Sequence, residues 1–128
     1  MCLQNTSMLC YHCSMAIGVD IEDIDRFKDK PDDFLDRVFT PVEIEYCRSF
    51  SKPESHYAAR FCAKEAVIKA LTALEITNVS YNEIEVFHNS YKCPQIRILK
   101  DLNKNLKFNL SLSHDRSKAI AFVTIEEQ

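Results

Sequence analysis

The amino-acid sequence predicts an α+β domain in which one long helix packs against an antiparallel sheet. A strand-like segment near the N-terminus is followed by helical patterns, and the period changes to two after about Leu74. One strand, then helices, then several strands is an order typical of α+β proteins. The length of 128 residues fits one domain, so we expect a single lobe.

The long helix is expected from about Ser51 to Leu74. At about 100° per residue, its apolar side chains form one broad stripe. Lys64 and Glu65 project from within this stripe, where a charge is unfavourable unless it is paired or ligated. Either Glu65 pairs with Lys69 one turn later while Lys64 extends to water, or both charges serve a site. The stripe comprises Tyr57, Ala58, Phe61, Cys62, Ile68 and Leu71.

The first strand is expected at residues 16–22, where apolar and polar residues alternate. One face carries Gly18, Asp20 and Glu22. Two carboxylates at this spacing repel each other unless a cation lies between them, and such oxygen ligands suit Mg²⁺; a solvated strand edge is the alternative. The opposite face is predicted to meet the core and carries Ile17, Val19 and Ile21.

Short helical segments are expected between the first strand and the long helix, at residues 23–30 and 31–37. Thr40-Pro-Val-Glu43 combines an N-cap, an N1 proline and an N3 glutamate, and predicts a helix that ends near Arg48. The similar spacing in Ser51-Lys-Pro-Glu54 predicts the start of the long helix. Basic side chains in this region form either a solvated surface or a patch for an acidic partner: Arg26, Lys28, Lys30 and Arg37.

Four strands are expected after the long helix. Residues 83–88 and 93–99 form a hairpin around the turn at 89–92. Residues 107–113 alternate, and residues 119–125 are apolar on both faces, which favours a central or interface strand. The inward side chains of the third strand are Phe108, Leu110 and Leu112.

Composition excludes several classes of protein. The chain has no apolar run long enough to span a membrane and no signal peptide. A net charge of −3 disfavours nucleic acid as a partner, and a single glycine excludes a glycine-rich phosphate loop. The six cysteines favour a reducing, cytoplasmic location; a metal or redox role for Cys10-x-x-Cys13 has little support. We expect residues 1–14 to be a disordered or peripheral leader and residues 15–128 to form the domain.

Four motifs, taken together, resemble the 4′-phosphopantetheinyl transferases of the short, holo-acyl-carrier-protein synthase type. The resemblance covers about residues 15–126. Its motifs are Gly18-x-Asp20-x-Glu22 with Arg26, Phe39-Thr40-x-x-Glu43, Arg60-Phe-x-Ala-Lys64-Glu65-Ala with Lys69, and Ser111-x-Ser113-His114.

The resemblance implies the fold and the reaction of that family. The enzyme moves 4′-phosphopantetheine from coenzyme A to a serine of an apo acyl carrier protein and releases 3′,5′-ADP, with Mg²⁺ as cofactor. The short type serves fatty acid biosynthesis, and it forms homotrimers with active sites between subunits. We therefore expect coenzyme A, an apo carrier protein and further copies of this chain as partners, and neither nucleic acid nor a membrane.

Residue roles follow by position from the same resemblance. The general base that takes the serine proton stays open among Glu65, Lys64 and a metal-bound water. The implied Mg²⁺ ligands are Asp20, Glu22 and Glu65. The implied catalytic residues are Lys64, Glu65 and Lys69. Contacts to coenzyme A are implied for Arg60, Lys64, Lys69, Pro94, Ser113 and His114. Contacts to the carrier protein are implied for Arg26 and Arg37.

Two segments depart from the family pattern. Leu71-Thr-Ala-Leu74 stands where members often have Gly-Thr-Gly, and Asn89-Ser-Tyr-Lys-Cys-Pro94 replaces an Asn-Gly-Lys-Pro hairpin. Both changes concern backbone contacts to coenzyme A. Two other functions remain as alternatives: another Mg²⁺-dependent phosphoryl or nucleotidyl transferase, and a non-catalytic module that binds carrier proteins.

Overall fold

The computed structural model describes residues 15–128, so the leader and the Cys10-x-x-Cys13 motif lie outside the described residues. No helix within that range is long and apolar enough to cross a membrane. The strands are β1 (Met15–Asp23), β2 (Ile84–His88), β3 (Pro94–Ile98), β4 (Leu106–His114) and β5 (Lys118–Glu127). The helices are α1 (Asp32–Val38), α2 (Pro41–Arg48), α3 (Glu54–Ala73) and the short 3-10 helices η2 (Ile24–Phe27) and η3 (Tyr81–Glu83).

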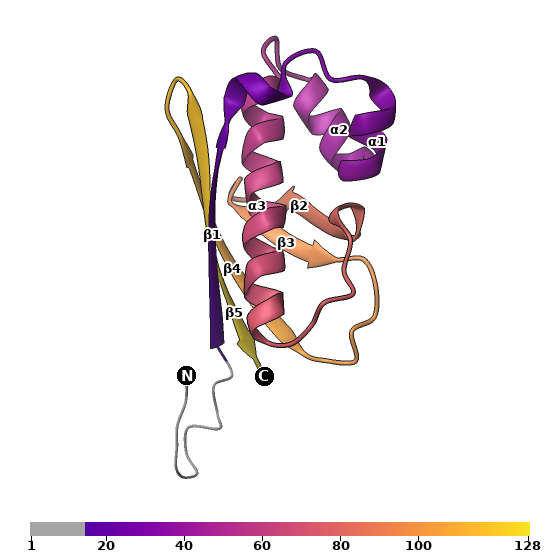
Figure 1. Cartoon of the computed structure of the whole chain (residues 1–128), viewed down its shortest axis with the longest axis vertical. Helices are drawn as coiled ribbons and strands as arrows, with labels where there is room; N and C mark the ends of the chain where they lie inside the picture. Colours follow the sequence, from indigo (N-terminus) through magenta and orange to yellow (C-terminus); the bar gives the residue numbers. More distant parts are fainter. Residues whose placement is uncertain (1–14) are drawn as a thin grey trace.

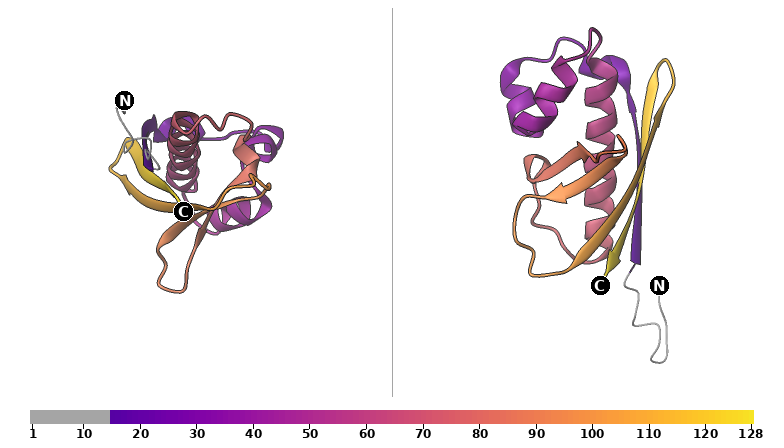
Figure 2. Two further views of the ribbon diagram at one scale, coloured as in Figure 1. Left: turned by 90° about the horizontal axis from the view of Figure 1, so that it is seen from below. Right: turned by 180° about the vertical axis from the view of Figure 1, so that it is seen from behind.

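Helix α3 lies at the centre of the fold. A three-stranded antiparallel sheet of order β1-β5-β4 covers one side of it, and α1, α2 and the β2–β3 hairpin lie on the other (Figures 1 and 2). This arrangement confirms the predicted α+β class with a long helix on an antiparallel sheet. The predicted strands are all present, and their ends differ from the expected ones by a residue or two.

The predicted orientation of β1 is wrong. Its inner face carries Ala16, Gly18, Asp20 and Glu22, whereas the isoleucines and valine between them point away from α3 and are exposed. The reason is the close approach of α3, because a Cβ atom built on Gly18 would lie 1.9 Å from the carbonyl oxygen of Ala66. Only small side chains fit along this line, so the larger apolar residues take the opposite face.

Strand β5 is the central strand, as its doubly apolar pattern predicts. Ala119, Ala121, Val123 and Ile125 are buried against α3. On the other side of the sheet, Ile120 pairs with Ile21 and Phe122 pairs with Val19 across the β1–β5 ladder. We call the large apolar side chains exposed on that side the outer face: Met15, Ile17, Val19, Ile21, Ile120 and Phe122.

One of the two predicted caps is confirmed. The Thr40 hydroxyl accepts a hydrogen bond from the Glu43 amide at 3.3 Å, and Glu43 Oε1 accepts from the Thr40 amide at 2.9 Å. The second cap is wrong, because α3 begins at Glu54 and no side chain in the described range caps it. Pro53 already has near-helical dihedral angles (φ −73°, ψ −13°) and takes the N-cap position, so Ser51 lies outside the helix start.

Candidate functional site

Three acidic side chains lie where β1 packs on α3. Asp20 and Glu22 follow Gly18 on the inner face of β1, and Glu65 extends from the middle of α3. The tight packing that places Gly18 against α3 also turns the two β1 carboxylates toward that helix. The Asp20 and Glu22 side chains are mostly removed from water.

Each of these carboxylates has a different partner. The Lys69 ammonium lies 3.3 Å from Asp20 Oδ1 and donates to the Val19 carbonyl at 2.9 Å. Arg26 donates to Glu22 Oε1, and the Tyr81 hydroxyl donates to Glu65 Oε2 at 2.6 Å. The simple pairing of Glu65 with Lys69 is therefore absent from the described residues.

The electrostatics of the three carboxylates favour a cation. Burial raises the pKa of Glu22, the neighbouring Asp20 carboxylate raises it further, and Arg26 opposes both effects. Asp20 Oδ2 is buried and has no hydrogen-bond partner within residues 15–128. Two closely spaced, mostly buried carboxylates with one unpartnered oxygen are a donor set that hard divalent cations bind, so these residues fit Mg²⁺.

The described range nevertheless contains no group of three His, Cys, Asp or Glu side chains gathered closely enough to hold a metal ion. Arg26 and Lys69 neutralise Glu22 and Asp20, where a divalent cation would otherwise supply the positive charge, and Glu65 is hydrogen-bonded to Tyr81.

Lys64 is placed differently from both explanations offered by the sequence. Its ammonium lies 2.8 Å from Glu43 Oε1, donates to the Tyr81 carbonyl at 2.9 Å and also donates to the Ile84 carbonyl. Both side chains of the Lys64–Glu43 pair are fully buried, and burial lowers the pKa of Lys64. Lys64 therefore reaches neither water nor the three carboxylates of the candidate site. It connects α3 to α2 and to the start of β2.

Arg60 and Pro94 lie on the other side of α3, near a hollow of about 750 Å³. The buried Arg60 stacks on Tyr46, with its guanidinium carbon 4.1 Å from the ring centroid, and Tyr46 stacks on His88. Pro94 pairs with His88 in the β2–β3 ladder. The hollow is lined by Val42, Tyr46, Phe50, Val86, Phe87, His88, Asn89, Lys92 and Arg97.

Ser113 and His114 lie at the end of β4, beside a smaller hollow of about 250 Å³. Ile21 and Ile120 of the outer face also line this hollow. His114 is exposed, and its Nδ1 is 3.2 Å from the Asp115 carbonyl. The structure thus places these residues beside the outer face.

The two arginines expected to meet a carrier protein are both well exposed. Arg26 follows β1 and packs over the Phe61 ring, with its guanidinium carbon 5.1 Å from the ring centroid. Arg37 extends from α1, where its guanidinium lies 3.7 Å from Asp33. Arg26 is paired with Glu22, one of the three acidic residues of the candidate site, whereas Arg37 contacts none of them.

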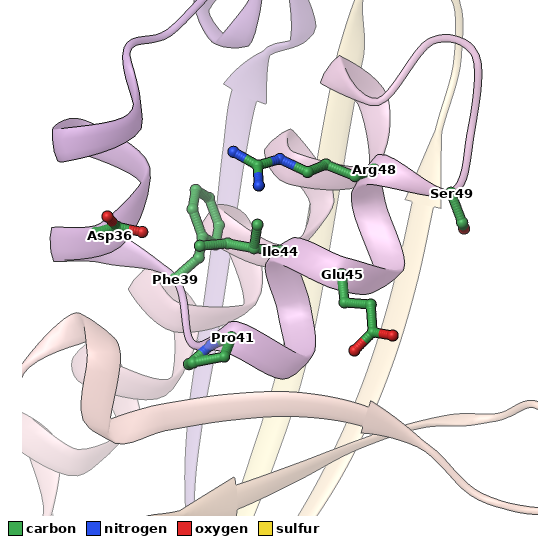
Figure 3. A pocket seen from close by; sticks show the side chains of 7 residues that line it. All are labelled: Asp36, Phe39, Pro41, Ile44, Glu45, Arg48 and Ser49. Atoms are coloured by element: carbon green, nitrogen blue, oxygen red, sulfur yellow. The ribbon is translucent and has the colours of Figure 1, made fainter.

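A further hollow of about 720 Å³ lies between α1 and α2 (Figure 3). Its walls include Phe39, Pro41 and Ile44, with Arg48 extending along one side. None of the predicted site residues, all of which lie in the described range, lines this hollow. The acidic chemistry is located between β1 and α3 instead.

Comparison with known proteins agrees with this arrangement. The sequence model of the 4′-phosphopantetheinyl transferase superfamily matches residues 16–123. The chain belongs to this superfamily. A holo-[acyl-carrier-protein] synthase of Thermodesulfovibrio yellowstonii is 42% identical over 114 residues, which cover 86% of this chain and 96% of that protein. The holo-[acyl-carrier-protein] synthase of a Geobacter species is 37% identical over 119 residues, covering 85% and 95%.

Solved structures of the family share the fold. The ACPS–CoA complex of Chronobacterium ammoniagenes has a TM-score of 0.76 at 26% identity and covers 89% of this chain and 98% of that one. A holo-(acyl-carrier-protein) synthase of Bacillus anthracis in complex with CoA (3′,5′-ADP) has a TM-score of 0.74 at 28% identity, covering 88% and 96%. The predicted transferase fold is therefore confirmed.

Two residues of the site were missed by sequence reasoning. Glu43 was expected to cap α2 and was quoted in a family motif without a contact to the site, yet its Oε2 also accepts from the Val86 amide at 2.6 Å, and its Oε1 lies beside Lys64. Tyr81 follows a loop after α3 and belongs to none of the transferase motifs quoted above. The one signal in the sequence was the presence of Lys64 and Glu65 on the apolar stripe of the long helix, because charges at such positions need buried partners.

Proposed function

We propose that this chain transfers 4′-phosphopantetheine from coenzyme A to a serine of an apo acyl carrier protein and releases 3′,5′-ADP. The observation that carries the proposal is a buried Asp20 oxygen that has no partner among residues 15–128, beside Glu22, in a member of this transferase superfamily. Relatives that this chain matches over most of their length are holo-[acyl-carrier-protein] synthases, and similar solved structures contain coenzyme A.

The carboxylates would hold Mg²⁺, with Asp20, Glu22 and Glu65 as its ligands. When bound, Mg²⁺ supplies positive charge that stabilises the pyrophosphate oxygens during displacement. Lys69 now neutralises Asp20, and its flexible side chain is suited to neutralise a phosphate oxygen instead when a divalent cation takes that role. Because Lys64 is fully buried against Glu43, Glu65 and a water on the bound metal remain as candidates to take the proton from the carrier serine.

The nucleotide end of coenzyme A would lie in the hollow beside the β2–β3 hairpin. Lys92 gives this hollow positive charge, Arg97 lines it while paired with Glu85, and the ring of Tyr46 forms part of its wall. Arg60 stacks directly behind that ring, and Pro94 begins the strand that borders the hollow. Positive charge beside a flat ring suits an adenosine phosphate.

We also propose a homotrimer. The outer face exposes large apolar side chains on two hydrogen-bonded strands, which is unusual for a surface that stays in water. Covering it with further copies of the chain would remove that surface from water. His114 and Ser113 lie at the edge of this face, so they would contact coenzyme A bound to a neighbouring subunit.

Arg26 and Arg37 would meet the acidic carrier protein, since both are exposed and basic. The described cysteines Cys47, Cys62 and Cys93 are free thiols, which supports a reducing cytoplasm as the location. In that compartment the reaction would serve fatty acid biosynthesis.

The test is intact mass spectrometry of an apo acyl carrier protein incubated with the enzyme, coenzyme A and Mg²⁺. The carrier should become heavier by one phosphopantetheine arm. Asp20→Asn and Glu65→Gln should abolish the gain while circular dichroism stays that of the wild type. No gain with several carrier proteins would overturn the proposal, and full activity of either variant would remove that residue from the metal site.

A further inference from the structure

Tyr81 is the hydrogen-bond partner of Glu65 at the candidate metal site. The phenol oxygen lies 2.6 Å from Glu65 Oε2, and both side chains are half-buried. None of the motifs that identify the family includes this tyrosine. It enters the site from η3, more than a dozen residues after the carboxylate that it contacts.

The position of Tyr81 is fixed at both ends. Its carbonyl accepts a hydrogen bond at 2.9 Å from Lys64, the residue directly before Glu65 on α3. Its ring packs on Phe61, which lies on α3 one turn before Glu65, at a centroid distance of 5.3 Å. Successive residues of α3 therefore hold the backbone and the hydroxyl of one tyrosine, and the ring cannot turn away without losing these contacts.

The segment that carries Tyr81 is also braced. Glu83 accepts a hydrogen bond from the Ser80 amide at 2.9 Å, and its carbonyl accepts from the Leu99 amide at 2.8 Å. Since Lys64 is itself paired with Glu43, the buried ion pair supports this short helix as well. The phenol is thus presented to Glu65 by a rigid element.

The partner of Glu65 differs in kind from those of the other two carboxylates. Asp20 and Glu22 contact cationic side chains, which neutralise them, whereas Tyr81 is a neutral donor. A neutral donor restricts the rotation of a carboxylate and occupies one oxygen without cancelling the negative charge. The second oxygen, Oε1, then remains for a cation.

We propose that Tyr81 is a positioning residue that orients Glu65 for the divalent cation through the hydrogen bond of its hydroxyl group. This inference rests on the proposed function and adds a residue to its metal site. Outer partners of this kind commonly change metal affinity by about 10–100-fold when they are removed. The effect should therefore appear in cation binding before it appears in the chemical step.

The experiment compares the full-length wild type with Tyr81→Phe, which keeps the ring and removes only the hydroxyl. Mn²⁺ binding to the enzyme is measured by electron paramagnetic resonance, and transfer rates are measured across Mg²⁺ concentrations. We expect the Mn²⁺ Kd and the Mg²⁺ concentration for half-maximal transfer to rise about tenfold or more. The rate at saturating Mg²⁺ should change much less, and the melting temperature should stay close to that of the wild type.

Tyr57→Phe is the matched control, because the Tyr57 hydroxyl is also buried but has no hydrogen-bond partner in the described structure. This variant should bind Mn²⁺ as the wild type does. Equal Mn²⁺ affinity of Tyr81→Phe and wild type, in an enzyme that modifies its carrier, would overturn the role of Tyr81 alone. A wild type that binds Mn²⁺ but never modifies a carrier would overturn the proposed function. The comparison of Mn²⁺ affinity between wild type and Tyr81→Phe would still test the role of Tyr81 in cation binding.

Discussion

The Lys64 ammonium and the Glu43 carboxylate lie 2.8 Å apart, and neither side chain is exposed to water. Glu43 also caps α2 and accepts from the Val86 amide, while Lys64 donates to the carbonyls of the first residue of η3 and of the residue that follows η3. The pair therefore connects α2, α3 and β2 through one group of hydrogen bonds. A pair that is this well satisfied tolerates burial, but the loss of either partner leaves a buried charge behind.

Lys64→Met should destabilise the fold by about 3–5 kcal/mol, because Glu43 then remains charged and uncompensated. The Glu43→Gln and Lys64→Met double variant should be less destabilised than Lys64→Met alone. Urea unfolding of the four proteins in this cycle measures the difference. A stable Lys64→Met protein that only loses transfer activity would show instead that Lys64 acts on coenzyme A.

Gly18→Ala should destabilise the protein by at least about 1–3 kcal/mol, the usual range for an overpacked core. The added methyl group would meet the Ala66 carbonyl at 1.9 Å, and a helix backbone cannot move aside as a side chain can. The displacement should also move Asp20 relative to Glu65 in the proposed metal site, so transfer activity should fall in the protein that still folds. Thermal melting and carrier mass together test this prediction. A variant as stable and active as the wild type would mean that α3 does not press on β1 so closely.

Val19→Glu should dissociate the proposed trimer, since it places a charge in the centre of the outer face. Light scattering after gel filtration measures the molecular mass. Leu99→Glu is the matched control, because Leu99 is 49% exposed and Val19 50%, yet Leu99 follows β3 and lies outside that face. A wild type that elutes as a monomer, or a trimeric Val19→Glu protein, would refute the assignment of this face to the interface.

Two inactive variants should restore each other if the sites are shared between subunits. Glu65→Gln removes a residue that one subunit provides, and His114→Ala removes one that its neighbour would provide. Random mixing would leave about a quarter of the sites with both wild-type residues, so co-expressed variants should recover about that share of wild-type activity. Activity no higher than that of the separate variants would indicate that His114 serves the site of its own subunit.

Stability should decrease in mild acid because of the histidines near Arg60. Burial first, and then the Arg60 charge, lower the pKa of His88 below its ordinary value of 6.5, and the pKa of His56 is lowered by the same causes. The unfolded chain then binds more protons than the folded protein just below pH 6.5, so the free energy of unfolding rises with pH in that window and levels off above it.

His88→Asn should flatten this dependence. Urea unfolding at several pH values between about 5 and 8 compares the two slopes. The double variant that also carries His56→Asn should be flatter still. An unchanged slope in the double variant would exclude these two histidines as its cause.

The pattern of the sequence was sufficient for the order and type of the elements. Alternation identified four strands, the doubly apolar pattern identified β5, and the Thr40–Glu43 spacing predicted a capping box that the structure contains. A few motifs at fixed spacing identified the superfamily. Such motifs are informative because the fold brings their residues, such as Asp20 and Glu65, to the same junction of β1 and α3. These are local signals, or signals at fixed spacing, and they do not depend on how closely two elements approach.

The sequence pattern did not predict which way the site side chains point. A period of two predicts that the faces of β1 differ, but only the contact between Gly18 and Ala66 decides that the small and acidic residues face α3. The same holds for Lys64, which has a helical neighbour of opposite charge at Glu65 but pairs with Glu43, twenty-one positions earlier in the chain.

The sequence by itself thus determined an α+β transferase fold and the acidic residues of its candidate site. The tertiary structure decided which charges support the core and which remain for chemistry. Lys64 is paired with Glu43 inside the protein, whereas the partner of Glu65 is the neutral Tyr81 hydroxyl. The physical reason is that the cost of burying a charge depends on the groups that surround it in space, and these groups come from segments far apart in the sequence.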